Sequence, residues 1–355
     1  MTRTSTNRMK FTSENTGVNL PWLNKHDGYQ STNWLNVDYD STKIEADLAL
    51  VESLGFTKIR TFLQIESVMA YDAGFTWNVT AKANLNDFFD RCENHGISVI
   101  AVMNSGNHDG ECASLDGKFR WDLPKTQGGI DVMVAAQTLY INELKTRDIL
   151  MFEFCNEPYC ELTWSAGAIS AGTTKAQMHT YLVQSYNNAK LLTDIPVGFS
   201  ELEEEEQEIY QTFSSASNRA NYVDDCTDIY SMHIYRPDSS YVYDFSSVVG
   251  KTKWCSEFGH LNYNDPSASE HPAAGNLELY KEASNFDAVM SISPKLINDG
   301  FGLIMPWSVA DNNGFIKHNA DGSHGVCRLA NEISGKIKSV RISTTSRMAA
   351  TRTAV

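Results

Sequence analysis

Asp148-Ile149-Leu150-Met151-Phe152-Glu153-Phe154-Cys155-Asn156-Glu157-Pro158 is an apolar run that ends in Asn-Glu-Pro. A second such run, Lys253-Trp254-Cys255-Ser256-Glu257-Phe258-Gly259, also carries a carboxylate near its end. Short, continuous apolar runs are typical of strands that are buried on both faces of a parallel sheet. The sequence therefore predicts two parallel strands, each with a glutamate at its carboxyl end, where barrel enzymes carry their active sites.

Six further apolar runs alternate with amphipathic segments along the rest of the chain. This alternation predicts a parallel sheet covered by helices, and eight strand-helix units predict a closed barrel. The eight strands are predicted to begin near Gly17, Lys58, Ile97, Ile149, Pro196, Asp228, Lys253 and Phe301. We therefore expect an α/β fold with one (β/α)₈ TIM barrel over residues 11–338, an N-terminal tail over 1–10 and a flexible C-terminal tail over 339–355.

Helix signals occur between these runs. Thr42 and Glu45 have the spacing of a capping box, which predicts that the first helix begins there. Two apolar stripes, each followed by a glycine that ends the helix, are predicted to face the core. They are Ile44, Leu48, Val51 and Leu54 before Gly55, and Leu85, Phe88, Phe89 and Cys92 before Gly96.

Composition excludes several classes of function. The formal net charge is −15 in 355 residues, which argues against nucleic acid as a partner and suits a neutral substrate. No apolar stretch reaches the roughly 18 residues that a membrane-spanning helix needs, so no membrane partner is expected. Oligomeric state has no signature in the sequence.

The cysteines and the N-terminus indicate how the protein is handled in the cell. Seven cysteines at irregular spacing predict mostly reduced thiols. No Cys-x-x-Cys or His-Glu-x-x-His occurs, so neither a catalytic metal nor a cofactor is expected. The first ten residues lack the apolar region of a secretory signal. Extracellular action would then require another export route, transport in a virus particle or a different natural N-terminus.

Two carboxylates in unlike surroundings are the equipment for breaking a glycosidic bond. One must hold a proton for the leaving oxygen, and the other must stay ionised to attack the anomeric carbon. Glu157 lies in a segment with aromatic neighbours that would raise its pKa, whereas Arg60 and Tyr235 would keep Glu257 ionised. A retaining enzyme of this type has its two carboxyl groups roughly 5–5.5 Å apart.

Other charged and aromatic residues are expected to support this pair. Glu153 in an apolar strand needs a partner, and we predict a structural ion pair with Arg60 rather than direct catalysis. Glu201 falls at a strand end and is a candidate to face the cleft, whereas residues 203–208 read as a solvated first helical turn. His233 and Tyr235 share one face of the sixth strand, and Trp307 would form a flat floor for a sugar ring.

The ordered set of motifs resembles glycoside hydrolase family 5. The segments that carry the resemblance, over residues 15–338, are Arg60, Phe152 to Pro158, His233-Ile234-Tyr235, Ser256 to Gly259 and Trp307. The resemblance implies a retaining glycosidase with Glu157 as acid/base and Glu257 as nucleophile. It also implies that Arg60, Asn104, Asn156, His233, Tyr235 and Trp307 bind substrate or support the site.

The substrate expectation rests on finer similarities. Asn104 stands where many cellulases of the family carry histidine, and this region is more similar to the endo-β-1,4-mannanase branch. Tryptophans near the expected strand ends predict an open cleft that stacks on a polymer, and they are Trp22, Trp34, Trp121, Trp164 and Trp307. We therefore expect endo-cleavage of a neutral β-1,4-linked polysaccharide, with mannan ahead of glucan. A barrel that binds carbohydrate without cleaving it is the alternative.

Overall fold

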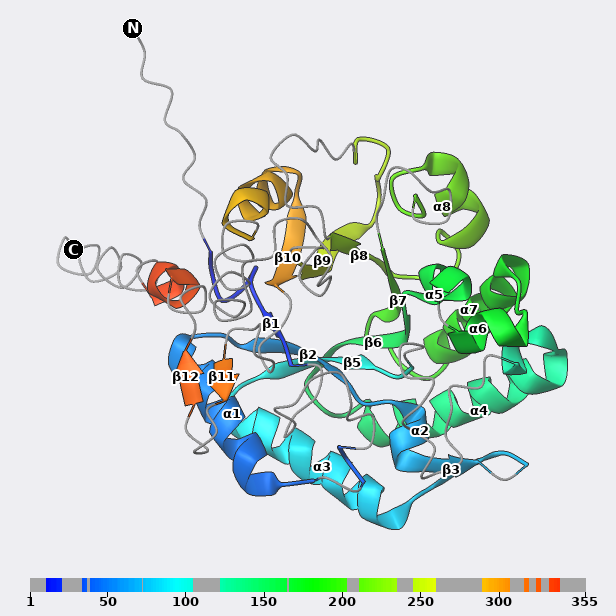
Figure 1. The fold of residues 1–355 in the computed structure, drawn as a ribbon, viewed down its shortest axis with the longest axis horizontal. Helices are drawn as coiled ribbons and strands as arrows, with labels where there is room; N and C mark the ends of the chain where they lie inside the picture. Colours follow the sequence, from blue (N-terminus) through cyan, green and yellow to red (C-terminus); the bar gives the residue numbers. More distant parts are fainter. Residues whose placement is uncertain are drawn as a thin grey trace, which may run out of the picture.

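The structure is a computed structural model of the chain. It describes residues 11–20, 34–36, 39–71, 73–104, 122–164, 166–202, 211–234, 245–259, 289–306, 316–318, 324–326 and 332–338. Eight parallel strands form one sheet that curls into a (β/α)₈ TIM barrel, with helices around its outside (Figure 1). The expected fold class is therefore confirmed. Both predicted tails, 1–10 and 339–355, lie outside the described residues.

All eight predicted strands are present, and they pair in chain order around the sheet. They are β1 (Val18–Asn19), β2 (Lys58–Phe62), β5 (Ser98–Val102), β6 (Ile149–Asn156), β7 (Val197–Leu202), β8 (Ile229–Ile234), β9 (Thr252–Phe258) and β10 (Phe301–Pro306). The barrel closes between β10 and the residues before β1. There the Gly17 N–H donates to Ile304 O (3.1 Å) and the Ile304 N–H donates to Asn15 O (2.9 Å).

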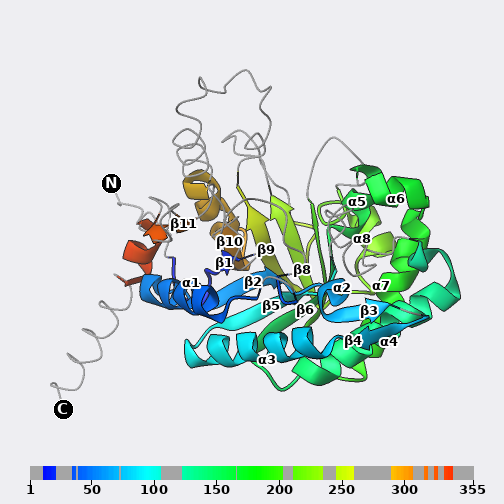
Figure 2. The ribbon, with the colours of Figure 1, turned by 60° about the horizontal axis from the view of Figure 1, so that its bottom comes forward.

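Five helices follow strands of the barrel along the chain, and α8 is shorter than the other four. They are α1 (Ser41–Leu54), α3 (Val79–Asn94), α4 (Gln127–Leu144), α7 (Lys175–Lys190) and α8 (Ala216–Tyr222). The short helices α5 (Pro158–Trp164) and α6 (Ala166–Ala171) follow the carboxyl end of β6 and lie side by side there (Figure 2). Smaller elements are α2 (Ile65–Val68), the 3₁₀ turn η2 (Leu123–Lys125) and the two-stranded pairs β3 (Met69–Tyr71) with β4 (Phe75–Trp77) and β11 (Ile316–His318) with β12 (His324–Val326).

The start of α1 corrects one prediction. The helix begins at Ser41, and Asp40 is its N-cap, because the Asp40 carboxylate accepts from the backbone N–H groups of Thr42 (3.0 Å) and Lys43 (3.2 Å). The capping box predicted at Thr42 is therefore wrong by two residues. Its predicted end is confirmed, because Gly55 adopts a φ of 89° that few other residues tolerate. Both predicted apolar stripes are buried.

The core has two layers that the alternation of strand side chains separates. The larger layer lies between the sheet and the helices. The smaller one contains Ile100, Met151, Ile229, Leu303 and Met305. Because these five come from strands that are not all neighbours in the sheet, they meet inside the barrel and fill it. Toward the carboxyl ends of the strands, buried polar side chains replace this apolar filling.

Candidate active site

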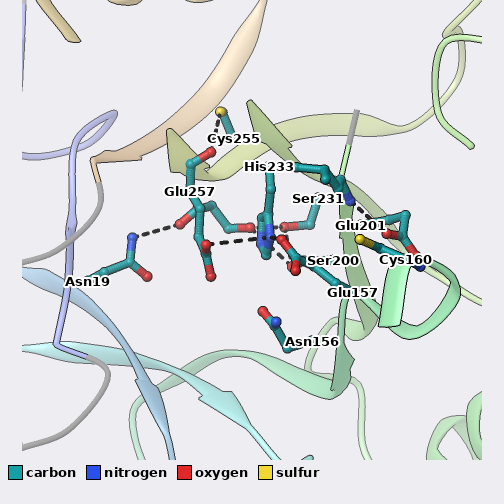
Figure 3. A network of polar contacts seen from close by, with 12 residues as sticks. Asn19, Asn156, Glu157, Cys160, Ser200, Glu201, Ser231, His233, Cys255 and Glu257 are labelled. Atoms are coloured by element: carbon teal, nitrogen blue, oxygen red, sulfur yellow. Dashed lines mark hydrogen bonds and ion pairs between the residues drawn. The ribbon is translucent and has the colours of Figure 1, made fainter. Parts of the chain in front are cut away.

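The polar layer brings together predicted site residues from four strands. Arg60 lies on β2, Asn156 and Glu157 lie at the end of β6, His233 lies on β8, and Glu257 lies on β9. All five are buried. Figure 3 shows Glu157, His233 and Glu257 with their side chains directed toward one another. This convergence follows from the parallel sheet, because the carboxyl ends of all its strands meet at one mouth.

Arg60 is the electrostatic centre of this layer. Its guanidinium donates from Nε to Glu153 Oε2 (2.8 Å) and from Nη2 to Glu153 Oε1 (2.5 Å), which is a bidentate pair. Nη1 donates to Glu257 Oε1 (2.5 Å). The predicted pairing of Arg60 with both glutamates is therefore present. The two carboxylates raise the pKa of Arg60 further above its usual range, against the effect of complete burial, so the cation is permanent.

Arg60 also fixes the orientation of Asn156. Nη2 of Arg60 donates to Asn156 Oδ1 (2.7 Å), and this contact identifies the side-chain oxygen. The NH₂ group of Asn156 therefore points away from Arg60 and can donate to another group. Asn156 lies at the carboxyl end of β6, directly before Glu157.

Glu157 adopts an unusual backbone conformation at the corner between β6 and α5. Its φ is 45°, in the left-handed region that residues with a side chain seldom occupy. The corner is held from both sides, because the Glu157 N–H donates to Ser200 O (2.8 Å) and the Glu157 C=O accepts from the Glu161 N–H (3.0 Å). Such local strain is found where the surrounding structure must direct one side chain to a functional position.

Burial gives Glu157 and His233 shifted pKa values. Burial raises the pKa of Glu157 to about 7, although the nearby Arg60 cation opposes this shift. Burial also lowers the pKa of His233 to about 4, so the imidazole is neutral at neutral pH. Nδ1 of His233 lies 2.6 Å from Glu157 Oε1 and 3.6 Å from Glu257 Oε2. The histidine thus stands between the two carboxylates without adding a charge.

The two carboxylates are close to each other. One oxygen of Glu157, one oxygen of Glu257 and a ring nitrogen of His233 all lie within 4.8 Å of one another. Their environments differ, because Glu257 receives a hydrogen bond from a cation and Glu157 faces a neutral imidazole. The same three residues have donor types that bind metals, but the Arg60 cation beside them opposes a second cation in this place.

Glu201 does not face the mouth of the barrel in the way that its strand-end position suggested. Its buried carboxylate accepts from the backbone N–H groups of Tyr159 (2.7 Å), Cys160 (3.3 Å) and Leu202 (2.8 Å). Two of these donors begin α5, directly after Glu157 and Pro158. Burial and the charge of Glu157 raise the pKa of Glu201 well above its usual range. Glu201 therefore anchors the segment that carries Glu157.

Asn104 also supports the site from within the protein. Its side-chain NH₂ group donates to Phe154 O (2.7 Å) and to the Tyr181 hydroxyl (3.2 Å), and its carbonyl oxygen accepts from the Asn156 N–H (2.9 Å). The acceptor for the Asn156 N–H is the backbone carbonyl of Asn104, and together these contacts tie the end of β5 to the end of β6. Asn104 thereby holds Asn156 and Glu157 from the side opposite to β7.

Sequence reasoning missed two parts of this layer. The hydroxyls of Ser200, Ser231 and Ser256 form a buried triangle with sides of 2.8, 2.8 and 3.1 Å across β7, β8 and β9. Asn19 on β1 donates to Ser256 O (2.8 Å), Met305 O (3.2 Å) and Pro306 O (3.2 Å), and its Oδ1 lies 3.4 Å from Arg60 Nη1. The sequence does carry a signal for these four residues, because each is a small polar residue inside an otherwise apolar run.

One predicted sugar platform is wrong. Trp34 is fully buried, its indole N–H donates to Phe62 O (2.9 Å), and its ring packs edge-on against Phe88. It is therefore a core residue. Several other predicted residues lie outside the described part of the chain, namely Trp22, Trp121, residues 203–208, Tyr235, Trp307 and the side chain of Trp164.

Five cysteines of the described residues have free thiols, and all five are buried: Cys92, Cys155, Cys160, Cys226 and Cys255. Among the helices that the structure describes, none has the length and apolar character that crossing a membrane requires.

Comparison with known proteins gives one family and many similar folds. The family model for Cellulase (glycosyl hydrolase family 5) matches residues 12–266. No curated protein matches the chain by sequence.

Three solved structures illustrate the similarity of fold. The β-mannanase from the blue mussel Mytilus edulis is 14% identical, with 83% of this chain and 86% of that chain covered and a TM-score of 0.55. The exo-β-1,4-mannosidase Op5Man5 from Opitutaceae bacterium strain TAV5 is 14% identical, with 96% and 62% covered and a TM-score of 0.63. The family 1 β-glucosidase from Thermotoga maritima is 12% identical, with 93% and 98% covered and a TM-score of 0.62.

Proposed function

Because this chain belongs to glycosyl hydrolase family 5, we propose that it hydrolyses a neutral β-1,4-linked polysaccharide by double displacement, with Glu157 as acid/base and Glu257 as nucleophile. Membership of the family makes the protein a glycoside hydrolase. The stereochemical course, the roles of the two glutamates and the identity of the sugar are the parts that we propose.

One observation carries this proposal: two carboxylates with unlike surroundings lie within 4.8 Å of one another, oxygen to oxygen. In retaining glycosidases the carboxyl groups are roughly 5–5.5 Å apart, whereas inverting enzymes leave roughly 6.5–9.5 Å for a water molecule. An oxygen-to-oxygen distance within this limit is compatible with the shorter spacing of a retaining enzyme. The raised pKa of Glu157, about 7, suits a group that must hold a proton near neutral pH.

The first step would form a covalent bond to Glu257. The Glu257 carboxylate attacks the anomeric carbon while Glu157 gives its proton to the departing glycosidic oxygen. Arg60 neutralises Glu257 in part, yet its second pair with Glu153 leaves the cluster with a net negative charge. An oxocarbenium-like transition state is positively charged, and this negative field stabilises it.

The second step would reverse the roles. Glu157, now ionised, takes a proton from water, and the water oxygen displaces Glu257 from the anomeric carbon. His233 stays neutral in both steps. Its Nδ1, 2.6 Å from Glu157 Oε1, can share the proton of that carboxyl group. The NH₂ group of Asn156, which Arg60 directs away from itself, is available to a sugar hydroxyl.

For the substrate we propose mannan first and β-glucan second. Mannan is supported by the mannanase-like segments around Arg60, Asn104 and Glu157 and by the mannan-degrading enzymes among the similar folds. Glucan is supported by the description of the matching family as a cellulase. A barrel that only binds carbohydrate would have no need of both carboxylates, the Arg60 cation and a strained Glu157 corner.

The decisive experiment measures release of reducing ends from soluble mannan, β-glucan and xylan, with Glu257→Gln as the control for contaminating activity. We expect the highest rate on mannan and none from the variant. Product sizes distinguish modes, because early mixed oligosaccharides indicate endo-cleavage. Proton NMR of the first product gives its anomeric configuration. Inversion at the anomeric carbon, or release of monosaccharide alone, would contradict the proposal.

A further inference from the structure

Outside the catalytic mouth, three potential metal ligands from separate elements converge. His179 lies on α7, and Asp225 and Cys226 lie in the turn between α8 and β8. One donor atom of each lies within 4.8 Å of the other two. Nε2 of His179 is 3.5 Å from Asp225 Oδ1. The cluster does not form a recognisable sequence motif, because Asp225 follows His179 by 46 positions.

The hydrogen bonds of Tyr159 determine which ring nitrogen of His179 carries hydrogen. The Tyr159 hydroxyl donates its one hydrogen to Tyr222 O (2.7 Å). Toward His179 Nδ1, 3.2 Å away, the same oxygen must therefore act as an acceptor. Nδ1 is then the protonated nitrogen, and in the neutral ring Nε2 presents a bare lone pair to Asp225.

Two atoms that donate electron pairs, His179 Nε2 and Asp225 Oδ1, therefore face each other. A lone pair on His179 Nε2 and a carboxylate oxygen of Asp225 repel unless a proton or a cation lies between them. The thiol of Cys226 is the third member, and its single hydrogen has Tyr222 O (3.4 Å), Val223 O (3.5 Å) and the Asp225 carboxylate as possible acceptors. Imidazole nitrogen, carboxylate oxygen and sulfur are the ligand types that Zn²⁺ accepts together.

We propose that His179, Asp225 and Cys226 bind one Zn²⁺ ion in a site separate from the catalytic carboxylates. Zinc lies roughly 2.0–2.2 Å from nitrogen and oxygen ligands, so two ligands of one tetrahedral ion are about 3.3–3.5 Å apart. The 3.5 Å between His179 Nε2 and Asp225 Oδ1 fits this spacing. The Cys226 sulfur must turn from the carbonyl groups toward the ion, and its proton is released to solvent.

The rest of the coordination shell is consistent with the surroundings. The side chains of His179 and Asp225 are 21% and 57% exposed, so water can occupy a fourth position. Tyr159 accepts from the distal ring nitrogen of His179, as the outer partners of zinc-bound histidines do. Since Tyr159 lies on α5, the ion would link α7, the turn before β8 and, through Tyr159, the segment that follows Glu157.

Cobalt binding to the full-length, chelator-treated protein tests the proposal. Co²⁺ occupies zinc sites and reports a thiolate ligand by near-ultraviolet charge-transfer absorption. We expect one equivalent of Co²⁺ to produce this absorption and Zn²⁺ to displace it. The absorption should be lost in Cys226→Ser and should require at least about tenfold more metal in His179→Gln. Zn²⁺ should also raise the Tm of the unsubstituted protein by a few degrees, and should not raise that of Cys226→Ser or His179→Gln.

Two controls separate this site from others. Cys92→Ser removes a buried thiol on α3, and Glu157→Gln alters the other cluster of potential ligands. Both should bind Co²⁺ as the unsubstituted protein does. Absence of a thiolate signal, its persistence in Cys226→Ser, or its loss in Glu157→Gln would each overturn the proposal. His179 is partly exposed, so unchanged Co²⁺ affinity in His179→Gln would overturn it even if Cys226→Ser did not fold.

Discussion

Oε1 of Glu157 lies 2.6 Å from Nδ1 of His233, and the two side chains are buried together. A carboxyl group with a pKa of about 7 thus shares a hydrogen bond with an imidazole whose pKa is about 4. Near neutral pH the pair can hold its proton on the glutamate or release it without charging the histidine. This arrangement is the basis of the first predictions.

The basic limb of the activity profile should reflect Glu157. Acid catalysis needs the protonated form, so kcat/KM should fall as pH rises through about 7. The measurement is kcat/KM against pH on a soluble polysaccharide. In Glu157→Gln the remaining activity should lack this limb, and a limb that persists unchanged would assign it to another group.

Replacement of Glu157 should depend on the leaving group. Glu157→Gln cannot protonate the glycosidic oxygen, so we expect a loss of roughly 10²–10⁴-fold on a polysaccharide. Formation of the covalent intermediate from an aryl glycoside with an acidic phenol should be much less affected, because that leaving group needs little protonation. Pre-steady-state release of the phenol measures this step. Equal losses on both substrates would rule out the acid role.

Replacement of Glu257 should abolish turnover and leave the fold intact. An amide cannot attack the anomeric carbon, so Glu257→Gln should lower kcat by at least about 10³-fold. The Gln oxygen can still accept from Arg60 Nη1, which should keep the barrel folded. Glu52→Gln on α1, an exposed position, is the matched control and should keep normal activity. Near-normal hydrolysis by Glu257→Gln would remove this residue from the mechanism.

Glu157 should also destabilise the protein at high pH. Its pKa is raised on folding from 4.5 to about 7, so the folded state binds the proton more tightly than the unfolded state. The favourable contribution is present below about pH 4.5 and is lost as pH rises through 7, up to about 3 kcal/mol. Glu157→Gln should therefore unfold at a higher Tm than the original protein at pH 8, and the difference should shrink at pH 5. A constant difference would contradict the shifted pKa.

Arg60 should be sensitive even to conservative change. Arg60→Lys loses the bidentate contact with Glu153. A single ammonium group also cannot contact Glu153, Glu257 and Asn156 at once, as the guanidinium does. A buried carboxylate left unpaired costs about 3–5 kcal/mol. We expect a loss of that order in the free energy of unfolding by urea, together with a large fall in kcat. Arg91→Lys, in a partly exposed pair on α3, is the control and should change stability little.

The sequence predicted the barrel and the charged centre for clear physical reasons. Strands buried on both faces produce apolar runs that need no knowledge of their partners, and all eight appear where expected. Glu153 within such a run demanded a cation, and Arg60 was the available one. The approach of Glu157 to Glu257 followed from parallel strands alone.

Other features depended on contacts that a sequence pattern does not encode. A tryptophan near a strand end can face a cleft or the core, and Trp34 faces the core because Phe62 O accepts its N–H. The Glu201 carboxylate accepts from backbone N–H groups at the start of α5, and these donors leave no mark in the pattern of side chains. The serine triangle and Asn19 are small polar residues whose partners lie on other strands. Asp40 and Thr42 are both good caps, and only the local backbone decides between them.

The side chain of Asn19 also has a bearing on synthesis. It reaches Met305 O, 286 residues further along the chain, and it touches Arg60 through its oxygen. β1 is the first strand of the barrel to leave the ribosome, whereas the groups that its Asn19 binds lie on the last two barrel strands, β9 and β10. Long-range contacts of this kind form late, because a large loop must close before they contribute. The contacts around Arg60, which binds Glu257, are therefore completed when the two ends of the barrel join. A nascent chain without β10 has no finished catalytic centre.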